Sequence, residues 1–269
     1  MLDLFNIPIP QTANYQEFYN ADVTSAVSAR DWVKPRGASM VRIMLIGGGG
    51  GGGNGTSSSG GGGGGSGAVT SWIGPAMFVP DVLNISVGAG GVNDNSGNQS
   101  QVYYKVGNFY LLLSANGGSR GAILGGAGGA AMTGNQFTAC GIYNSVAGQS
   151  GAAGQASSSG GNVAVSATTF LSGGAGGSGA AASTGGRVTP NYGYIRLENT
   201  PAGGTVKGAD GYFINQPILV GCGGAGGTTS TSVGTGGGNG GIGCGGGGSG
   251  EDGGSGGRGG DGAIFIWAW

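Results

Sequence analysis

Few residues of this chain belong to the types that catalyse reactions or bind metals. Histidine is absent, so neither a Ser-His-Asp triad nor a Cys-His pair can form. One charge cluster lies inside a glycine-rich stretch and contains Glu251, Asp252, Arg258 and Asp261. Converging carboxylates could bind calcium, but a solvated loop with one local ion pair accounts for the same residues. We therefore expect no catalytic residue, no metal site, no cofactor and no enzymatic activity.

Two other features with chemical potential also favour a structural interpretation. The three cysteines, Cys140, Cys222 and Cys244, are odd in number and widely spaced, which fits neither a disulfide framework nor a zinc site. We expect them to be small buried apolar residues. Glycine patterns typical of nucleotide-binding loops occur by chance in such a chain, and no lysine follows residues 47–65 at the required spacing.

Aromatic side chains are the remaining candidates for a binding site. Seven of them sit between glycine-rich blocks, where the tips of loops are expected. Aromatic residues at such tips often contact proteins or sugars, but they could equally cap the ends of the glycine-rich blocks and pack on each other or on another subunit. These residues are Phe137, Tyr143, Phe170, Tyr192, Tyr194, Tyr212 and Phe213.

The charge distribution argues against a nucleic-acid partner. Ten basic and eleven acidic residues give a net charge of −1, and residues 121–186 carry no charged side chain. No basic patch exists to contact phosphates. No apolar run approaches the ~18 residues of a membrane-spanning helix.

The elements that must position these residues fall into two parts, an arm at residues 1–38 and a domain at residues 39–269. In the domain, residues 40–114 predict antiparallel strands, including Ala76–Val79, with a glycine excursion at residues 47–67. Gly107-Asn108 predicts a hairpin turn. Residues 263–269 predict a closing strand with Ile264, Ile266 and Ala268 on one side and Phe265, Trp267 and Trp269 on the other.

Glycine dominates the stretch from residue 115 to 262. The chain has 72 glycines among 269 residues, against a usual share of ~7 %. They come in blocks without the every-third spacing and proline content of collagen. Ordering a glycine costs ~0.5–1 kcal/mol more than ordering an alanine, so an ordered structure requires a hydrogen bond from nearly every peptide.

A lattice of neighbouring left-handed, three-residue-per-turn helices meets this requirement, because such helices direct N–H and C=O groups to several sides. Loop tips should interrupt the lattice between its blocks. Glycines that face neighbouring helices, such as Gly176 and Gly224, should tolerate no side chain. Ser, Thr, Ala and Asn should occupy outer positions, so replacement of Ser178 should have little effect. The expected fold is all-β, a small antiparallel β sandwich with a polyglycine II-like lattice.

The N-terminal arm has a more ordinary composition. Leu4, Phe5 and Ile7 are apolar, and Tyr15, Phe18 and Tyr19 follow helical i, i+3, i+4 spacing, which predicts one amphipathic helix. So short a segment buries too little surface to fold alone. We expect the arm to dock on another chain, although a helix that covers the core of its own domain is the alternative.

Four sequence signatures in order resemble glycine-rich domains of bacteriophage structural proteins. Together they cover residues 32–269. They are Trp32-x-Lys-Pro-x-Gly37 with Val41-Arg-Ile-Met-Leu-Ile-Gly-Gly-Gly, Leu83-Asn-Ile-Ser-Val-Gly-Ala-Gly-Gly91, Leu112-Leu-Ser-Ala-Asn-Gly-Gly118, and Gly259-Gly-Asp-Gly-Ala-Ile-Phe-Ile-Trp267.

The resemblance implies a virion protein, a tail-fibre tip or another surface component, that contacts other virion proteins through its arm. It also implies attachment to a host-surface glycan or protein and assembly as a homotrimer. Two alternatives remain open. A polyglycine antifreeze-like protein would need regular Gly-x-x spacing and no strands at residues 40–114. An elastomeric coat protein would be disordered.

Overall fold

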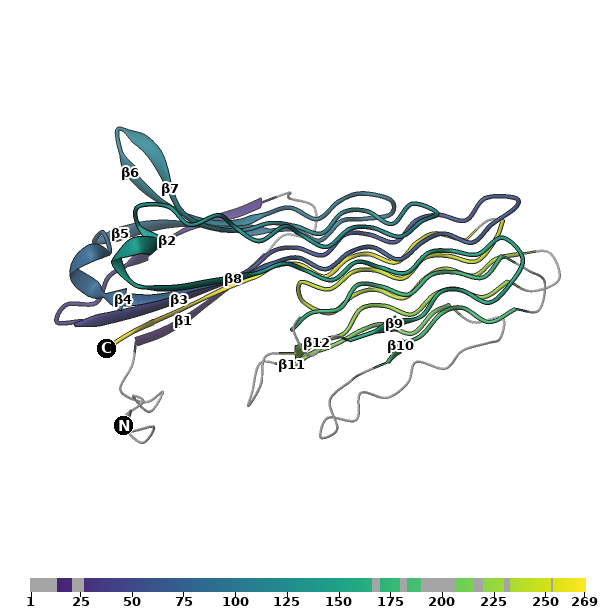
Figure 1. Ribbon diagram of the computed structural model, residues 1–269. Coiled ribbons are helices and arrows are strands. Elements are labelled where there is room, and N and C mark those ends of the chain that lie inside the picture. The colour runs from purple at the N-terminus through teal and green to yellow at the C-terminus, as the bar shows by residue number, and fades with distance from the viewer. Residues whose placement is uncertain are drawn as a thin grey trace, which may run out of the picture.

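The computed structural model describes residues 14–20, 27–165, 170–179, 183–189, 207–214, 220–229, 233–252 and 254–269. A β sandwich forms one end of the molecule, and long wavy glycine tracts extend from it in a bundle (Figure 1). The described residues contain no helix long and apolar enough to cross a membrane.

Two antiparallel sheets face each other across the main hydrophobic core, as the sequence predicts. The five-stranded sheet has the order β1(Asn14–Tyr19), β13(Ala263–Ala268), β3(Met40–Ile46), β4(Val69–Pro75), β8(Ile142–Val146). The four-stranded sheet has the order β2(Val27–Val33), β5(Val82–Gly88), β6(Ser100–Val106), β7(Asn108–Ala115).

Two-residue alternation decides which side chains fill this core. In β13, Ile264, Ile266 and Ala268 point into the sandwich, whereas Phe265 and Trp267 join a cluster on the outer face of the five-stranded sheet. This confirms the two-sided pattern predicted for the closing strand. Trp32 and Trp72 are fully buried in the same core.

Most of the predicted strand order is confirmed. The glycine excursion lies between β3 and β4, and the β6–β7 hairpin turns at Gly107, whose φ is +71°. Such a φ favours glycine. Residues 76–79 differ from the prediction, because Ala76–Phe78 form a short 3-10 helix, η2, instead of a strand.

The predicted amphipathic helix in the arm is wrong. Residues 14–19 form the edge strand β1, which pairs antiparallel with β13 along its whole length. Tyr15 stacks on Trp267 with ring centroids 5.0 Å apart, while Phe18 points into the core. Cross-strand pairing with the otherwise unpaired edge of β13 outweighs the helical spacing of the aromatic residues.

The glycine tracts form the predicted lattice, and the central tract 60–68 shows how. Each of its nine N–H groups donates to a carbonyl oxygen of another tract at 2.6–3.0 Å. Successive residues turn to different neighbours, and every third residue returns to the same one. The N–H groups of Gly60, Gly63 and Ser66 reach tract 149–155, those of Gly61, Gly64 and Gly67 reach 243–249, and those of Gly62, Gly65 and Ala68 reach 116–122.

The carbonyl groups of the same tract complete its surroundings. They accept hydrogen bonds from three further segments, 47–53, 126–129 and 174–177. Six neighbours with a three-residue repeat define a hexagonal array of three-fold helices. Tracts 47–53, 171–179 and 243–251 are surrounded in the same way.

The tracts use one hand of the three-fold helix. Among the described tract glycines only Gly125 and Gly243 have positive φ, and both lie at turns. The negative φ elsewhere corresponds to the left-handed polyglycine II form, so the mirror image that glycine also allows is not used. Among the described residues of the lattice, pleated pairing is limited to isolated bridges and to strands of two residues. These strands are β9(Val163–Ala164), β10(Val188–Thr189), β11(Phe213–Ile214) and β12(Val220–Gly221).

The prediction that small polar and apolar residues occupy only outer positions is wrong. Ser66, Ala175, Ser178 and Ser249 are fully buried inside the lattice. The serine hydroxyls find partners there. Ser66 Oγ, for example, donates to the carbonyl oxygen of Leu171 at 3.2 Å and accepts from the N–H of Gln149 at 2.8 Å.

We expect Gly176→Val or Gly224→Val to destabilise the protein by more than about 3 kcal/mol, beyond the usual cost of overpacking. A Cβ at either position would lie 1.9 Å from a carbonyl oxygen of a neighbouring tract, Ala153 O or Gly238 O. Thermal unfolding monitored by circular dichroism measures the effect. Ala127→Val, at an exposed tract position, is the matched control, and equal losses in all three variants would contradict the lattice packing.

Ser178→Ala should cost about 1–2 kcal/mol and not be silent, because it removes a buried hydroxyl from its partners. Ser178 Oγ donates to the carbonyl oxygen of Ser183 at 3.1 Å and lies 3.2 Å from Thr229 Oγ1. Chemical denaturation should separate this variant from Ser157→Ala, which removes an exposed hydroxyl. Indistinguishable midpoints would show that the buried network contributes nothing.

Candidate functional site

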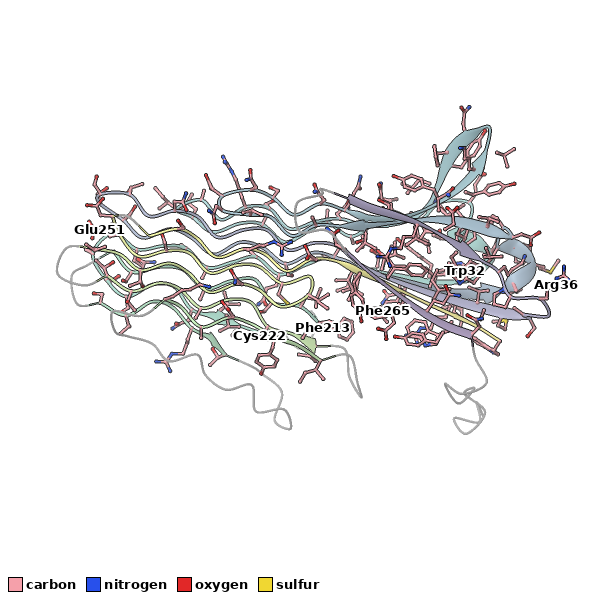
Figure 2. All side chains as sticks on the ribbon, turned by 180° about the vertical axis from the view of Figure 1, so that it is seen from behind. Trp32, Arg36, Phe213, Cys222, Glu251 and Phe265 are labelled. Carbon is pink, nitrogen blue, oxygen red and sulfur yellow. The ribbon has the colours of Figure 1, made fainter. Side chains whose placement is uncertain are left out.

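The charge cluster predicted at residues 251–261 does not come together. Arg258 and Asp261 form an ion pair, and Asp261 Oδ1 also accepts from the N–H of Gly90 at 2.8 Å. Glu251 lies at the end of the lattice farthest from the sandwich (Figure 2). No group of three acidic, cysteine or histidine side chains among the described residues is arranged to hold a metal ion. The four residues therefore form a local ion pair, Arg258 with Asp261, and a separate turn that contains Glu251 and Asp252.

The cysteines occupy two kinds of environment. Cys222 and Cys244 are buried free thiols, as the sequence predicts, but Cys140 is exposed. Burial raises the pKa of Cys222 from 9.0 to about 11, and it raises the pKa of Cys244 as well. The buried neutral thiol of Cys222 therefore stabilises the fold below pH 9, and this contribution is lost as the pH rises toward 11. Neither buried thiol is suited to act as a nucleophile near neutral pH.

Two of the seven aromatic candidates belong to the sandwich and not to loop tips. The Phe137 ring stacks on Trp72 with centroids 4.6 Å apart. The Tyr143 side chain, on β8, packs on the core and donates its hydroxyl to the carbonyl oxygen of Met132 at 2.6 Å. Both rings thus cover the open side of the core near β4.

The other described aromatic candidates lie on different parts of the molecule. Phe170 is partly exposed and borders a hollow on the outer face of β3, β4 and β8. Tyr212 packs on the cluster that contains Val163 and Val220, and Phe213 packs on the cluster that contains Phe265 (Figure 2). Tyr192 and Tyr194 lie outside the described residues. The described candidates do not form one common surface.

The docking-arm residues divide in the same way. Leu4, Phe5 and Ile7 lie outside the described residues. Tyr15 and Tyr19 stand on the outer face of β1, and both hydroxyls donate to the carboxylate of Glu17. Burial, followed by the hydrogen bond to Glu17 and its charge, raises the pKa of Tyr19 to about 12. Phe18 belongs to the core of its own chain.

A row of aromatic rings continues from these tyrosines across the sheet. Trp267 lies between Tyr15 and Arg42, whose guanidinium carbon is 5.0 Å from the centre of its ring. This row leaves β1 with an amphipathic, partly exposed outer surface. Its polar groups are Glu17 and Arg42.

A second exposed apolar surface is the tip of the β6–β7 hairpin, which rises away from the sandwich (Figure 1). Pairing between β5 and β6 ends at Tyr103, so the tip is a ribbon of two strands. Val106, Phe109 and Tyr110 are each more than half exposed there. Exposed apolar side chains in such number commonly mark contact sites.

The end of the lattice opposite the sandwich is a surface that the sequence analysis missed. Four turns of the described chain meet there. Hydrogen bonds join them to each other, as from Asp252 N to Thr56 O at 3.0 Å, and to neighbouring tracts, as from Gly62 N to Ala122 O at 2.6 Å. Most side chains of these turns are polar, but the apolar side chain of Leu124 is 84 % exposed. We call this surface the distal face, and it consists of residues 54–59, 122–125, 155–159 and 251–252.

No sequence pattern distinguished the distal turns, because serine, threonine and glycine also occur inside the tracts. Only Ile123-Leu124, an apolar pair between glycines, differs from its surroundings. The signal that could have located these turns is the count of residues between successive tracts. That count becomes meaningful only once the tract length is known.

In the native protein we expect one of the three thiols, that of Cys140, to react with a disulfide reagent such as DTNB at pH 8. Burial and the raised pKa values protect the other two. In denaturant all three should react at similar rates. Rapid reaction of three thiols in the native state would contradict the buried positions, and Cys140→Ser should abolish the native signal.

Comparison with known proteins agrees with this architecture. Residues 24–269 match the protein family described as Glycine-rich domain. The matched region spans the sandwich from β2 onward and the entire glycine lattice. No curated protein sequence matches the chain. The chain belongs to the glycine-rich domain family.

Proposed function

We propose that the protein is a structural component of a bacteriophage virion, a tail-fibre tip or another surface part, which assembles with other virion proteins and attaches to the host surface. The observation that carries the proposal is the hydrogen-bonded glycine lattice, which holds a set of exposed turns at a fixed distance from the β sandwich. The phage assignment rests on the four signatures in residues 32–269 and the resemblance they carry.

The lattice suits a protein that must present a surface rigidly. Its interior tracts are bonded on six sides, so each turn of the distal face is fixed by the tracts that enter and leave it. Turns on the surface can change in sequence without altering the tracts, because their side chains leave the packed region. We assign host attachment, to a glycan or a protein, to the distal face.

The sandwich end suits assembly. The exposed β6–β7 tip and the aromatic row on β1 are both partly apolar, and the arm residues Leu4, Phe5 and Ile7 precede that row in sequence. We assign the contacts with other virion proteins, and those within a homotrimer, to this end. The near-zero net charge presents little repulsion between copies.

The role that we propose is not catalytic and uses no cofactor. The chain has no histidine, and the buried thiols of Cys222 and Cys244 are held in their neutral form. Several charged side chains of the lattice pair locally, as Arg258 does with Asp261 and Lys207 with Asp210.

Attachment can be tested with fluorescently labelled full-length protein and a panel of bacterial strains. We expect retention on the host strain and at least about tenfold weaker retention for the double variant Ile123→Ser, Leu124→Ser, which removes the apolar part of the distal face. Burial of one or two such side chains accounts for a change of this size.

Met77→Ser is the matched control, because Met77 is 81 % exposed at the sandwich end. It should bind cells as the unmodified protein does. Retention on no strain, or equal retention of the distal variant, would contradict attachment through the distal face. Inhibition of ice growth by the protein would support the antifreeze-like alternative instead.

A further inference from the structure

Side-chain oxygen atoms complete the hydrogen bonding at the margins of the lattice. Where a tract lacks a neighbouring carbonyl, an Asp or Asn oxygen takes its place and accepts the backbone N–H. Such capping protects a backbone edge from pairing with other chains. The pairs are Gly90 N with Asp261 Oδ1, Arg187 N with Asn162 Oδ1, Asn239 N with Asp210 Oδ1, Gly256 N with Asn54 Oδ1, and Arg258 N with Asn239 Oδ1, all at 2.7–3.0 Å.

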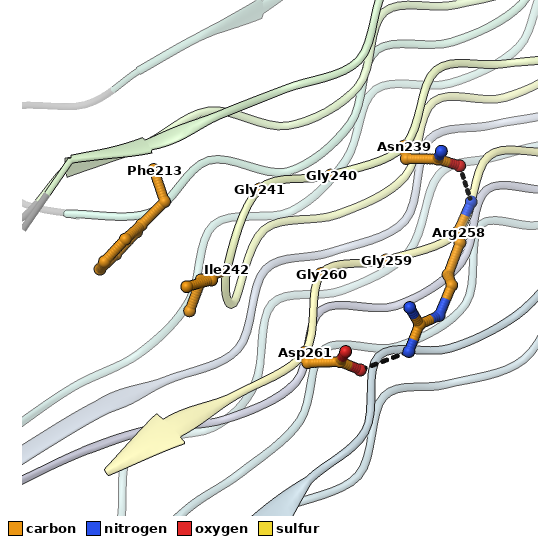
Figure 3. A pocket seen from close by; sticks show the side chains of 9 residues that line it. All are labelled: Phe213, Asn239, Gly240, Gly241, Ile242, Arg258, Gly259, Gly260 and Asp261. Atoms are coloured by element: carbon orange, nitrogen blue, oxygen red, sulfur yellow. Dashed lines mark hydrogen bonds and ion pairs between the residues drawn. The ribbon is translucent and has the colours of Figure 1, made fainter. Parts of the chain in front are cut away.

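One margin is capped incompletely, between tracts 234–242 and 254–261. Two hollows of about 380 and 470 Å³ lie along these tracts and share Asn239 and Arg258 as lining residues. We call these two adjoining hollows together the furrow. Figure 3 shows its sandwich-side half, where Asn239 reaches across to the backbone of Arg258.

The first wall of the furrow presents free carbonyl groups. In tract 234–242, carbonyl groups that are three residues apart point in the same direction, so the carbonyls form three series that point in three directions. One series accepts hydrogen bonds from residues 244–250, and a second accepts from residues 208–211. The third series includes Gly237 and Gly240, and no described residue donates to either carbonyl.

The second wall presents N–H groups. In tract 254–261, one series of N–H groups, those of Gly257 and Gly260, donates to residues 244–247. A second series, those of Gly256 and Gly259, donates to the Asn54 side chain and to the carbonyl oxygen of Gly91. The third series consists of the N–H groups of Ser255, Arg258 and Asp261. Within the described part of the chain, only the Arg258 N–H has an acceptor, which is Asn239 Oδ1.

We propose that the furrow binds an extended glycine-rich strand of another polypeptide in the same three-fold conformation as the tracts. The two walls are bonded to each other, from Gly237 N to Ser255 O at 3.0 Å and from Gly240 N to Arg258 O at 2.8 Å. The free carbonyl groups of the first wall and the free N–H groups of the second wall therefore face the same position beside the two tracts, where a further tract of the lattice could lie. The interior tracts are held in positions of this kind.

The chemistry of the furrow favours a peptide backbone over a charged ligand. Its charged side chains are already paired, Lys207 with Asp210 and Arg258 with Asp261, so the rim carries little net charge. The free groups are carbonyls and N–H groups with the three-residue repeat of the lattice. A strand that enters must carry glycine at the positions that face the walls, for the same steric reason as the tracts themselves.

Gly236 provides a way to close the furrow with only a small shift of the neighbouring backbone. A Cβ there would have only two heavy atoms within 4 Å, Ser255 O at 3.2 Å and Lys207 Cγ at 3.7 Å. At Gly237 and Gly257, by contrast, it would lie 2.0 Å or less from a carbonyl oxygen. A leucine at position 236 should therefore extend into the furrow and block it.

The test uses full-length protein and a fluorescein-labelled peptide that copies residues 171–179, Leu-Ser-Gly-Gly-Ala-Gly-Gly-Ser-Gly. Fluorescence anisotropy should show saturable binding, which weakens at least about tenfold in Gly236→Leu. It should tighten about threefold in Asn239→Ala, which frees the Arg258 N–H for one more hydrogen bond. The amide signals of Ser255 and Asp261 should shift in NMR spectra when the peptide is added.

Ala127→Leu adds the same side chain at an exposed tract position away from the furrow and should bind the peptide normally. A peptide with valines in place of Gly174 and Gly176 should not bind. The proposal is overturned if the unmodified protein does not bind the glycine peptide, or if Gly236→Leu and Ala127→Leu behave alike while thermal unfolding shows both folded. It does not depend on host attachment, because it concerns neither the distal face nor cells.

Discussion

The whole architecture depends on the separation between neighbouring glycine tracts, which leaves no room for a Cβ. At Gly177 a Cβ would lie 1.7 Å from the carbonyl oxygen of Ser249, and similar contacts recur through the lattice. Because glycine has no side chain, the backbones lie close enough for each peptide to form a hydrogen bond with a neighbouring tract. The direction of that hydrogen bond is set by the position of the residue in the three-residue repeat. Hydrogen bonds to several neighbours then replace the side-chain packing that stabilises ordinary domains.

Such a lattice needs an external reference for its register, because successive glycines are chemically alike. The sandwich supplies one. Strands β3, β4 and β13 continue directly into tracts 47–53, 60–68 and 254–262, so their side-chain alternation fixes where each tract begins. A shift by one residue in the sandwich would expose its core side chains. The β sandwich, whose strands have an ordinary composition, therefore sets the register of the glycine tracts.

The same contrast explains what the sequence could predict. Two-residue alternation located the strands at residues 40–114 and the two faces of β13, and glycine content predicted the three-fold lattice. The prediction of a helix around Tyr15 was wrong because β1 pairs with β13, which lies more than 240 residues later in the sequence. The local spacing of apolar residues does not reveal such a distant partner. The aromatic candidates were separated for the same reason. Phe137 and Tyr143 fill the side of a core whose other members lie elsewhere in the chain.

The margins of the lattice show how its polar residues are used. A serine inside a tract, such as Ser66 or Ser172, donates or accepts where two tracts meet imperfectly. An Asp or Asn at a margin, such as Asp210 or Asn162, accepts an N–H that would otherwise be open to another chain. Dilution of glycine by polar residues thus limits the growth of a structure that could otherwise add strands without end. A margin left partly uncapped, like that at Ser255 and Asp261, is a place where addition of one strand remains chemically allowed.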